Sequence, residues 1–333
     1  MKKLIWKVTL GVGAGVAIYV GFSVWAGARS VGHALASFNW IMALLALGLA
    51  SLNYGVRYAR WHYYLKVLGL RQVTAGHSLL IFLAGFSLTV TPGKLGEAVK
   101  ALLLRESHGI PAARTAPIVV AERFTDLVGL LLLACVGVFS FHVDRRFLAM
   151  GAAVIALGLV MVSVEPIAMF FLRLAGRLPG VHRFADKLHE AYQATAALLK
   201  PGPLVIAVLL STLSWYFECV AFVVVVHGFP GAAIGNQAGT FIYASMTVAG
   251  ALSFLPGGLG VTEAGILALL GELGTGTGRS VAAAATFVTR LCTLWYAVLV
   301  GLVALFIFAR RNHIQVQLPE KTGNASSGAT QHP

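Results

Sequence analysis

Charged residues are scarce in this sequence. They make up only 11% of the 333 residues, whereas 58% of the residues are hydrophobic. A soluble domain of this size could not bury so much apolar side-chain surface. Several apolar runs reach the roughly 20 residues that a helix needs to cross a bilayer, and the alternating pattern of a membrane β-barrel is absent. The composition therefore predicts an all-α, polytopic integral membrane protein.

Patterns that bind metals or cofactors are also missing. The three cysteines, Cys135, Cys219 and Cys292, are far apart within apolar runs, where a free cysteine usually serves as a packing residue. The pair His189-Glu190 is not followed by a second histidine at the spacing of a zinc motif. We therefore expect no metal and no cofactor.

Acidic residues are outnumbered, 12 against 25 Lys and Arg, which gives a net charge of +13. In a soluble protein this excess would point to nucleic acid, but here most charges fall in short loops between apolar runs. Membrane topology and anionic lipid explain that distribution better, so no nucleic-acid partner is expected. Lys2, Lys3 and Lys7 place the N-terminus in the cytoplasm, and the long first run lacks a convincing signal-peptide cleavage site.

Six apolar runs are long enough to be full spans. They cover residues of about 4–26, 40–61, 116–141, 147–164, 203–226 and 280–308. This topology puts both termini in the cytoplasm, with 18 of the 25 Lys and Arg residues inside, four outside and three within a cytoplasmic (inner) membrane. Residues of about 166–200 are predicted to form an amphipathic segment on the cytoplasmic surface. Residues 313–333 are predicted to be a disordered cytoplasmic tail.

Two further apolar runs are each broken near the middle by a Pro-Gly turn. The breaks contain Pro92, Gly93 and Lys94 in the first run and Pro256, Gly257 and Gly258 in the second. Each arm is too short to cross a bilayer alone, so we expect two re-entrant helical hairpins, over about 76–105 and 237–273. Irregular backbone at that depth is tolerated where protein or water covers it. A full span kinked by proline remains the alternative for the first run.

A span with one arginine follows each break. Arg123 comes 31 residues after Pro92, and Arg290 comes 34 residues after Pro256. We interpret this order as a duplicated unit, with repeat one at about 40–142 and repeat two at about 202–309. The first hairpin is predicted to enter from the cytoplasm and the second from outside. The repeats would therefore be inverted, which is typical of transporters.

The intramembrane polar residues form the candidate substrate site, because charges inside a membrane are costly and usually functional. The predicted substrate-binding residues are Pro92, Gly93, Lys94, Glu97, Glu122, Arg123, Asp126, Pro256, Gly257, Gly258, Glu263 and Arg290. The cations and the half-helix N-termini at the breaks would hold a phosphate group. No residue is predicted to be catalytic.

The carboxylates of this site have several interpretations. They would balance the cations, bind a cationic part of a head group or carry protons, and Glu218, the lone carboxylate of its span, would contribute to the same balance. Three central cations, Lys94, Arg123 and Arg290, face up to five carboxylates, so some carboxylates would have to be protonated. A purely structural ion-pair cluster in the third span remains the alternative.

Arg57, Arg60 and Trp61 end the second span. Their expected place is the membrane interface, where two interpretations stay open. They form a belt of snorkelling side chains that fixes topology, or they contact lipid phosphate where a lipid gains access to the protein.

Four motifs together resemble a known family. They are Tyr54-x-x-Arg57-x-x-Arg60-Trp61, Thr91-Pro-Gly-Lys-Leu-Gly-Glu97, Glu122-Arg123-x-x-Asp126 and Pro256-Gly-Gly-Leu-Gly-Val-Thr-Glu263. Over most of residues 1–310 the chain resembles the transmembrane, flippase-type domain of lysylphosphatidylglycerol synthases, which would occupy residues 1–312 here. The resemblance implies transbilayer movement of a lipid with a phosphate head group. In those synthases an aminoacyl-transferase domain follows the membrane part, and we expect none here, so the synthase activity is not carried over.

Two other functions remain open from the sequence. One is a non-transporting accessory protein for an envelope-lipid synthase, which would then be its partner. The other is an intramembrane lipid-modifying enzyme, which needs a nucleophile and base or a metal cluster. His77 and His108 flank the first hairpin rather than the central motifs. We therefore expect a membrane-lipid transporter and not an enzyme.

Overall fold

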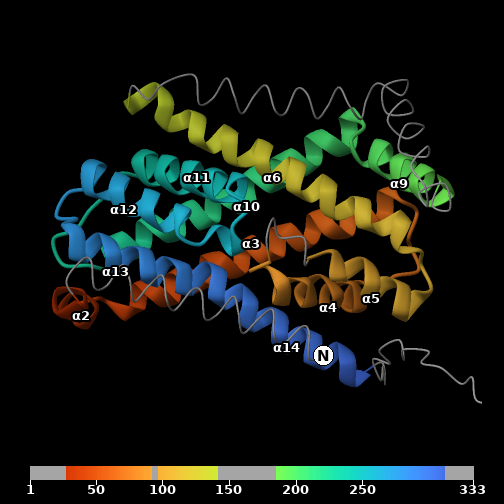
Figure 1. Cartoon of the computed structure of the whole chain (residues 1–333), viewed down its shortest axis with the longest axis horizontal. Coiled ribbons are helices and arrows are strands. Elements are labelled where there is room, and N and C mark those ends of the chain that lie inside the picture. Colours follow the sequence, from red (N-terminus) through yellow and green to blue (C-terminus); the bar gives the residue numbers. More distant parts are fainter. Residues whose placement is uncertain (1–27, 92–96, 142–184, 312–333) are drawn as a thin grey trace, which may run out of the picture.

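The computed structural model describes residues 28–91, 97–141 and 185–311, and every element within them is helical (Figure 1). The α-helices are α2 (Ala28–Ala36), α3 (Trp40–Val67), α4 (Ala75–Gly85), α5 (Val99–His108), α6 (Ala112–Phe141), α9 (Ala185–Leu198), α10 (Pro201–His227), α11 (Asn236–Leu252), α12 (Val261–Leu273), α13 (Arg279–Arg290) and α14 (Tyr296–Arg311). Three short elements join them, namely η1 (Phe86–Leu88), η4 (Pro256–Gly258) and η5 (Leu291–Trp295). The predicted spans at about 4–26 and 147–164, most of the amphipathic segment and the predicted tail lie outside the described residues.

Three helical segments of the described chain are long and apolar enough to cross a membrane. They are α3, α10 and the continuous segment Arg279–Arg311, which joins α13, η5 and α14. Large apolar side chains on their outer faces are more than half exposed, for example Leu44, Leu209 and Phe306. Exposed apolar surface of this kind marks contact with a membrane. The protein is therefore a helical membrane protein, whereas the number of spans and the re-entry of the hairpins stay predictions.

Local sequence signals fix the ends of the long helices. Asn39 caps α3, since its side chain accepts a hydrogen bond of 3.1 Å from the backbone N–H of Ile41. Pro201 begins α10, where its missing N–H has no cost. Gly109 ends α5 with a left-handed conformation (φ 65°), which glycine adopts without strain.

The same order of elements occurs twice. A long helix, a pair of short helices and a second long helix appear as α3, α4, α5 and α6, and again as α10, α11, α12 and the segment of α13 and α14. We call α4, η1 and α5 hairpin one, and α11, η4 and α12 hairpin two. Helices of the first set pack against helices of the second. Helix α4 packs against α14, α11 packs against α6, and α3 packs along α10. Figure 1 shows the two hairpins at opposite ends of the molecule, both directed toward its middle.

The last described residues before the first break lie beside the second break in the interior. Val90, two residues before Pro92, shares a buried apolar cluster with Leu259, Leu294 and Val298. A Cβ placed on Gly257 would lie 3.7 Å from Cγ1 of Val90. The η4 turn itself depends on glycine, since Gly257 has a φ of 61° that other residues rarely adopt. Residues 92–96, which include Pro92, Gly93 and Lys94, lie outside the described residues.

Candidate functional site

Charged side chains gather in the protein interior, where hairpin one, α3 and α6 meet the second half of the chain. The buried ones in the described ranges are Arg57, Arg60, Glu97, Lys100, Glu122, Asp126, Glu218, Glu263 and Arg290, and Arg123 is partly buried. A buried charge costs several kcal/mol unless a partner compensates it. Each of these buried charges therefore needs a partner of opposite charge or a hydrogen-bonding group nearby.

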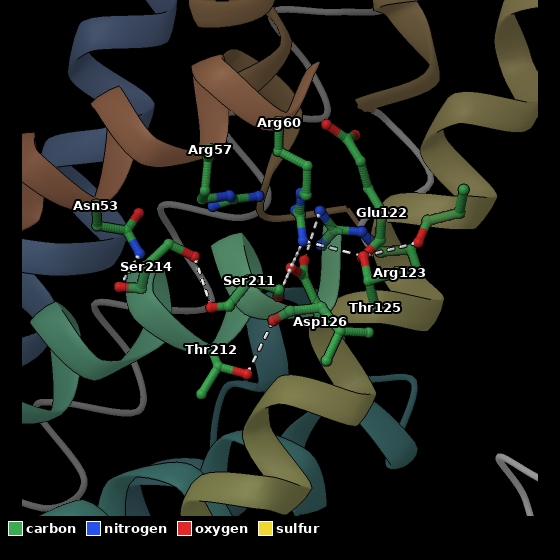
Figure 2. Close-up of polar contacts among 12 residues, drawn as sticks. Asn53, Arg57, Arg60, Glu122, Arg123, Thr125, Asp126, Ser211, Thr212 and Ser214 are labelled. Carbon is green, nitrogen blue, oxygen red and sulfur yellow. Dashed lines mark hydrogen bonds and ion pairs between the residues drawn. The ribbon is translucent and has the colours of Figure 1, made fainter. Parts of the chain in front are cut away.

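Asp126 of α6 has partners on three helices (Figure 2). Its Oδ1 accepts hydrogen bonds from Arg60 Nη1 at 2.7 Å and from Ser211 Oγ at 2.8 Å. Its Oδ2 lies 3.1 Å from Arg123 Nη2, and Arg60 also donates to Thr125 Oγ1 at 3.0 Å. This cluster therefore joins α3, α6 and α10 through one buried carboxylate.

Lys100 of α5 lies in the same interior, with 1% of its surface exposed. Its Nζ donates to Glu122 Oε2 at 2.5 Å and lies 3.7 Å from Glu97 Oε2. The ammonium group also lies over the rings of Trp61 and Phe82, at 4.8 and 5.4 Å from their centroids. Such contacts stabilise a desolvated cation. Lys100 was one of the 18 Lys and Arg residues expected on the cytoplasmic side, but its side chain is buried in the protein interior.

Glu97, directly after the first break, connects the two parts of this cluster. Its Oε2 lies 3.1 Å from Arg123 Nη2 and 3.8 Å from Arg57 Nη2, in addition to its contact with Lys100. One carboxylate at the start of the second arm of hairpin one thus contacts cations from α3, α5 and α6. We call Arg57, Arg60, Glu97, Lys100, Glu122, Arg123 and Asp126 the first ion-pair cluster.

The second half has a smaller counterpart. Glu263, just after the second break, accepts a hydrogen bond of 2.6 Å from Arg290 Nε and one of 2.6 Å from the backbone N–H of Gly260. Arg290 Nη2 donates to the carbonyl oxygen of Gly257 at 2.6 Å. In both halves, then, a glutamate after the break pairs with the arginine of the next long helix.

A single π-helical turn follows Arg290. It is η5, and it interrupts the long segment between α13 and α14. A π-turn leaves a helix locally irregular, and such turns are frequent at functional sites. Tyr54 of α3 donates from its hydroxyl to the backbone carbonyl of Thr293 in this turn at 3.0 Å. The irregular turn is therefore held against the helix that carries Arg57.

A cavity of about 240 Å³ lies between these groups. Its charged lining residues are Arg57, Arg123, Asp126, Glu218 and Arg290, and the backbone of Gly257 and Gly258 forms another part of its wall. Ligand pockets for drug-sized molecules have volumes of about 300–1,000 Å³. A cavity of this size admits a polar head group but not the acyl chains of a lipid.

Comparison with known proteins identifies the family of this chain. The family described as Lysylphosphatidylglycerol synthase TM region matches residues 12–301, a range that contains every residue of the cavity. This chain belongs to that family. Two proteins of Methanothermobacter thermautotrophicus, both described as UPF0104 membrane proteins, are 25% identical to it over 308 and 310 residues. These alignments cover 86% and 85% of this chain and 90% of each relative. This member of the lysylphosphatidylglycerol synthase TM-region family is thus a multi-pass membrane protein.

Among the arginines that line the cavity of this family member, Arg57 has the fewest hydrogen-bond partners in the described ranges. It is 5% exposed, and within the described residues it makes no hydrogen bond. Its one ion-pair contact is the 3.8 Å approach to Glu97, and its guanidinium lies over Phe86 and Trp215 at 5.1 and 5.9 Å. Arg290, by contrast, uses its donors on Glu263 and Gly257. Arg57 therefore has free donors in the cavity that an anionic ligand can use.

Glu218 of α10 also lines the cavity. Its Oε2 accepts a hydrogen bond of 2.7 Å from the hydroxyl of Tyr243 on α11. Among the described residues it has no ion pair with a cation, although it is 6% exposed. A bound cation, a nearby arginine beyond contact distance or a proton is needed to compensate such a buried carboxylate.

The structure places Arg57, Arg60 and Trp61 differently from the sequence expectation. We expected an interfacial position, but all three are buried in the interior. The reason is tertiary pairing. Arg60 binds Asp126, Arg57 approaches Glu97, and the indole N–H of Trp61 donates to Ser78 Oγ at 3.1 Å. Their burial contradicts an exposed belt of snorkelling side chains at these three positions.

The expected excess of carboxylates over cations is also wrong for the described chain. Arg57, Arg60 and Lys100 join Arg123 and Arg290 in the interior. Those five cations match five carboxylates, which are Glu97, Glu122, Asp126, Glu218 and Glu263. Of the predicted substrate residues, all but Pro92, Gly93 and Lys94 are described. The described ones line the cavity or belong to the ion pairs beside it, except Pro256, which lies in η4 between the lining residues Leu255 and Gly257.

Several cavity residues were not found from the sequence. Tyr54, Thr89 and Tyr243 line the cavity, and an uncharged polar residue in an apolar helix gives no signal of its own. Lys100 could have been found, because it lies three residues after Glu97 and so shares its helical face. Within the described ranges, no group of three or more His, Cys, Asp or Glu side chains could hold a metal ion.

Proposed function

We propose that this protein moves a phosphate-bearing lipid, or a lipid-linked envelope precursor, between the leaflets of the cytoplasmic membrane. One observation carries the proposal. Two hairpins that come from opposite ends of the molecule approach each other at Val90 and Gly257, beside a cavity lined by three arginines. A phosphate crossing a bilayer must lose its water, and arginine can replace that hydration with charge-assisted hydrogen bonds.

The proposed architecture is an inverted repeat with six full spans, two re-entrant hairpins and both termini in the cytoplasm. The reciprocal packing of α4 on α14 and of α11 on α6 supports this interpretation, as does the antiparallel course of α3 and α10 in Figure 1. In transporters built from inverted repeats, the substrate site lies near the midplane at the interface of the repeats. In the proposed architecture the cavity would be that site.

In this proposal the head group enters the cavity and its phosphate binds Arg57, with Arg123 and Arg290 close by. Glu97 and Glu263 hold those two arginines in place before the lipid arrives. Because each ion pair is already formed, binding requires little rearrangement of the site. Accessory function for an envelope-lipid synthase and intramembrane lipid modification are the alternatives.

Purified protein in vesicles separates the three functions. Vesicles of the total polar lipids of the host membrane, each carrying a trace of one fluorescent lipid, are treated with a membrane-impermeant quencher. Translocation makes the inner-leaflet pool of a phosphate-bearing lipid accessible, and Arg57→Gln slows that exchange at least tenfold. Chemical change of the lipid would support an enzyme. No movement of any phosphate-bearing lipid would contradict translocation.

A further inference from the structure

The exposed lining residues of the cavity, among those that the structure describes, come from one short segment. They are Ala251, Leu252, Phe254 and Leu255, which lie between the end of α11 and the η4 turn. The three large ones are 48%, 71% and 43% exposed, respectively. All four side chains are apolar, whereas the charged residues of the cavity lie behind them. The opening therefore has a hydrocarbon rim and a polar interior.

Phe254 has a strained backbone at this opening. It is the one non-glycine residue in the described ranges with a positive φ, at 55°. This conformation is unfavourable for a bulky side chain. Burial does not offset the cost, because the ring is the most exposed large hydrophobic group of the described chain. Strain that no packing interaction repays points to a role in function.

The position of the opening fits a lipid in the membrane. Hairpin two is directed from one end of the molecule toward its middle, and residues 251–255 lie near its break (Figure 1). The surface there is apolar and faces outward, so hydrocarbon covers it in a bilayer. A lipid has the same order of polarity as this site, with a charged head group beside apolar chains.

We propose that residues 251–255 form a lateral portal through which the hydrocarbon chains of a lipid project while its anionic head group occupies the cavity. Phe254 is the side chain that contacts those chains. This inference rests on the proposed function, since it takes the cavity as the head-group site. It also moves lipid access away from Arg57, Arg60 and Trp61, which are buried, to the rim of hairpin two.

Photo-crosslinking tests the portal without a transport assay. Benzoylphenylalanine replaces Phe254 or Leu255, and in a matched control it replaces Phe306, which is 57% exposed on α14 and does not line the cavity. The protein is irradiated in vesicles of the host's total polar lipids, and the lipid adducts are identified by mass spectrometry. At positions 254 and 255 one phosphate-bearing class is enriched about tenfold over its share of the bilayer, the ratio that a single charge-assisted hydrogen bond supports. At position 306 the adducts match the bulk lipid.

A second substitution links the portal to the cavity. Arg57→Gln removes the enrichment at 254 and 255 and leaves the adducts at 306 unchanged. Adducts of bulk composition at both portal positions would overturn the portal, even if the vesicle assay shows lipid movement. Enriched adducts that depend on Arg57 would support the portal, even if no lipid moves, and in that case translocation alone would fail.

Discussion

Arg57 and Arg290 line the same cavity, but their surroundings give them different roles. Arg290 is fixed by Glu263 and by the carbonyl of Gly257, each at 2.6 Å. Within the described residues, Arg57 has one ion-pair contact, the 3.8 Å approach to Glu97, and lies over the rings of Phe86 and Trp215. Glu97 keeps Arg123 and Lys100 when Arg57 is removed. Arg290 therefore maintains the fold of the η4 turn, whereas Arg57 is available to a ligand.

Substitution separates these two roles. Arg290→Gln leaves Glu263 buried without its cation, and we expect it to lower the free energy of unfolding by about 3–5 kcal/mol. Arg57→Gln leaves no carboxylate unpaired, so we expect a clearly smaller loss of unfolding free energy than for Arg290→Gln, together with a loss of co-purified lipid. Thermal unfolding in detergent and mass spectrometry of bound lipid measure the two effects. Equal destabilisation by both substitutions would show that Arg57 is a structural residue. Arg57→Lys would restore lipid poorly, because an ammonium group lacks the planar donors of guanidinium.

The strain at Phe254 gives a second prediction at the residue scale. Phe254→Gly allows the left-handed backbone and gives up little buried surface, so we expect it to raise the free energy of unfolding by about 1 kcal/mol. For Phe306→Gly, within α14, we expect the opposite, namely a decrease of about 1 kcal/mol in the free energy of unfolding. Thermal unfolding of both variants in the same detergent provides the measurement. Destabilisation by Phe254→Gly would mean that the ring contributes packing that its 71% exposure hides.

At the scale of elements, α14 and hairpin one depend on a close approach. A Cβ at Gly301 would lie only 2.2 Å from the backbone nitrogen of Ser87 in η1, whereas a Cβ at Gly55 of α3 meets no atom within 4 Å. We expect Gly301→Ala to lower the free energy of unfolding by about 1–3 kcal/mol, because α14 must move away from η1. Gly55→Ala should raise it by up to about 1 kcal/mol. Thermal unfolding of the two variants measures these changes. Tolerance of alanine at both positions would show that the contact between α14 and η1 is loose.

The long helices were predictable, and their irregularities were not. Hydropathy located α10 and the segment Arg279–Arg311 to within a few residues, because each has an almost continuous apolar run. The end of α3 was placed at about residue 61, but the helix continues to Val67. Arg57 and Arg60 were interpreted as an interface because sequence hydropathy does not reveal a carboxylate on another helix. The π-turn η5 and the φ of Phe254 likewise depend on tertiary packing, for which the local sequence carries no signal.

At the scale of the whole molecule, each hairpin packs mainly on a long helix of the other half. Hairpin one contacts α14 and hairpin two contacts α6, while the tips share the cluster of Val90 and Leu259. A movement of either hairpin therefore displaces a helix that carries, or directly follows, a cavity arginine. That arrangement can couple opening on one side of the membrane to closure on the other, as rocking of repeats around a fixed site requires.

Membrane topology tests the inverted arrangement directly. In a variant without Cys135, Cys219 and Cys292, single cysteines replace Arg71, Arg105, Asn236 or Arg279. Figure 1 shows the start of hairpin one and the start of hairpin two at opposite ends of the molecule. We therefore expect a membrane-impermeant thiol reagent to label positions 236 and 279 only from outside and positions 71 and 105 only from the cytoplasm. Because 71 and 105 flank hairpin one, labelling of 105 from outside would turn that hairpin into a full span. The repeats would then no longer be inverted, and the two breaks could not serve opposite leaflets.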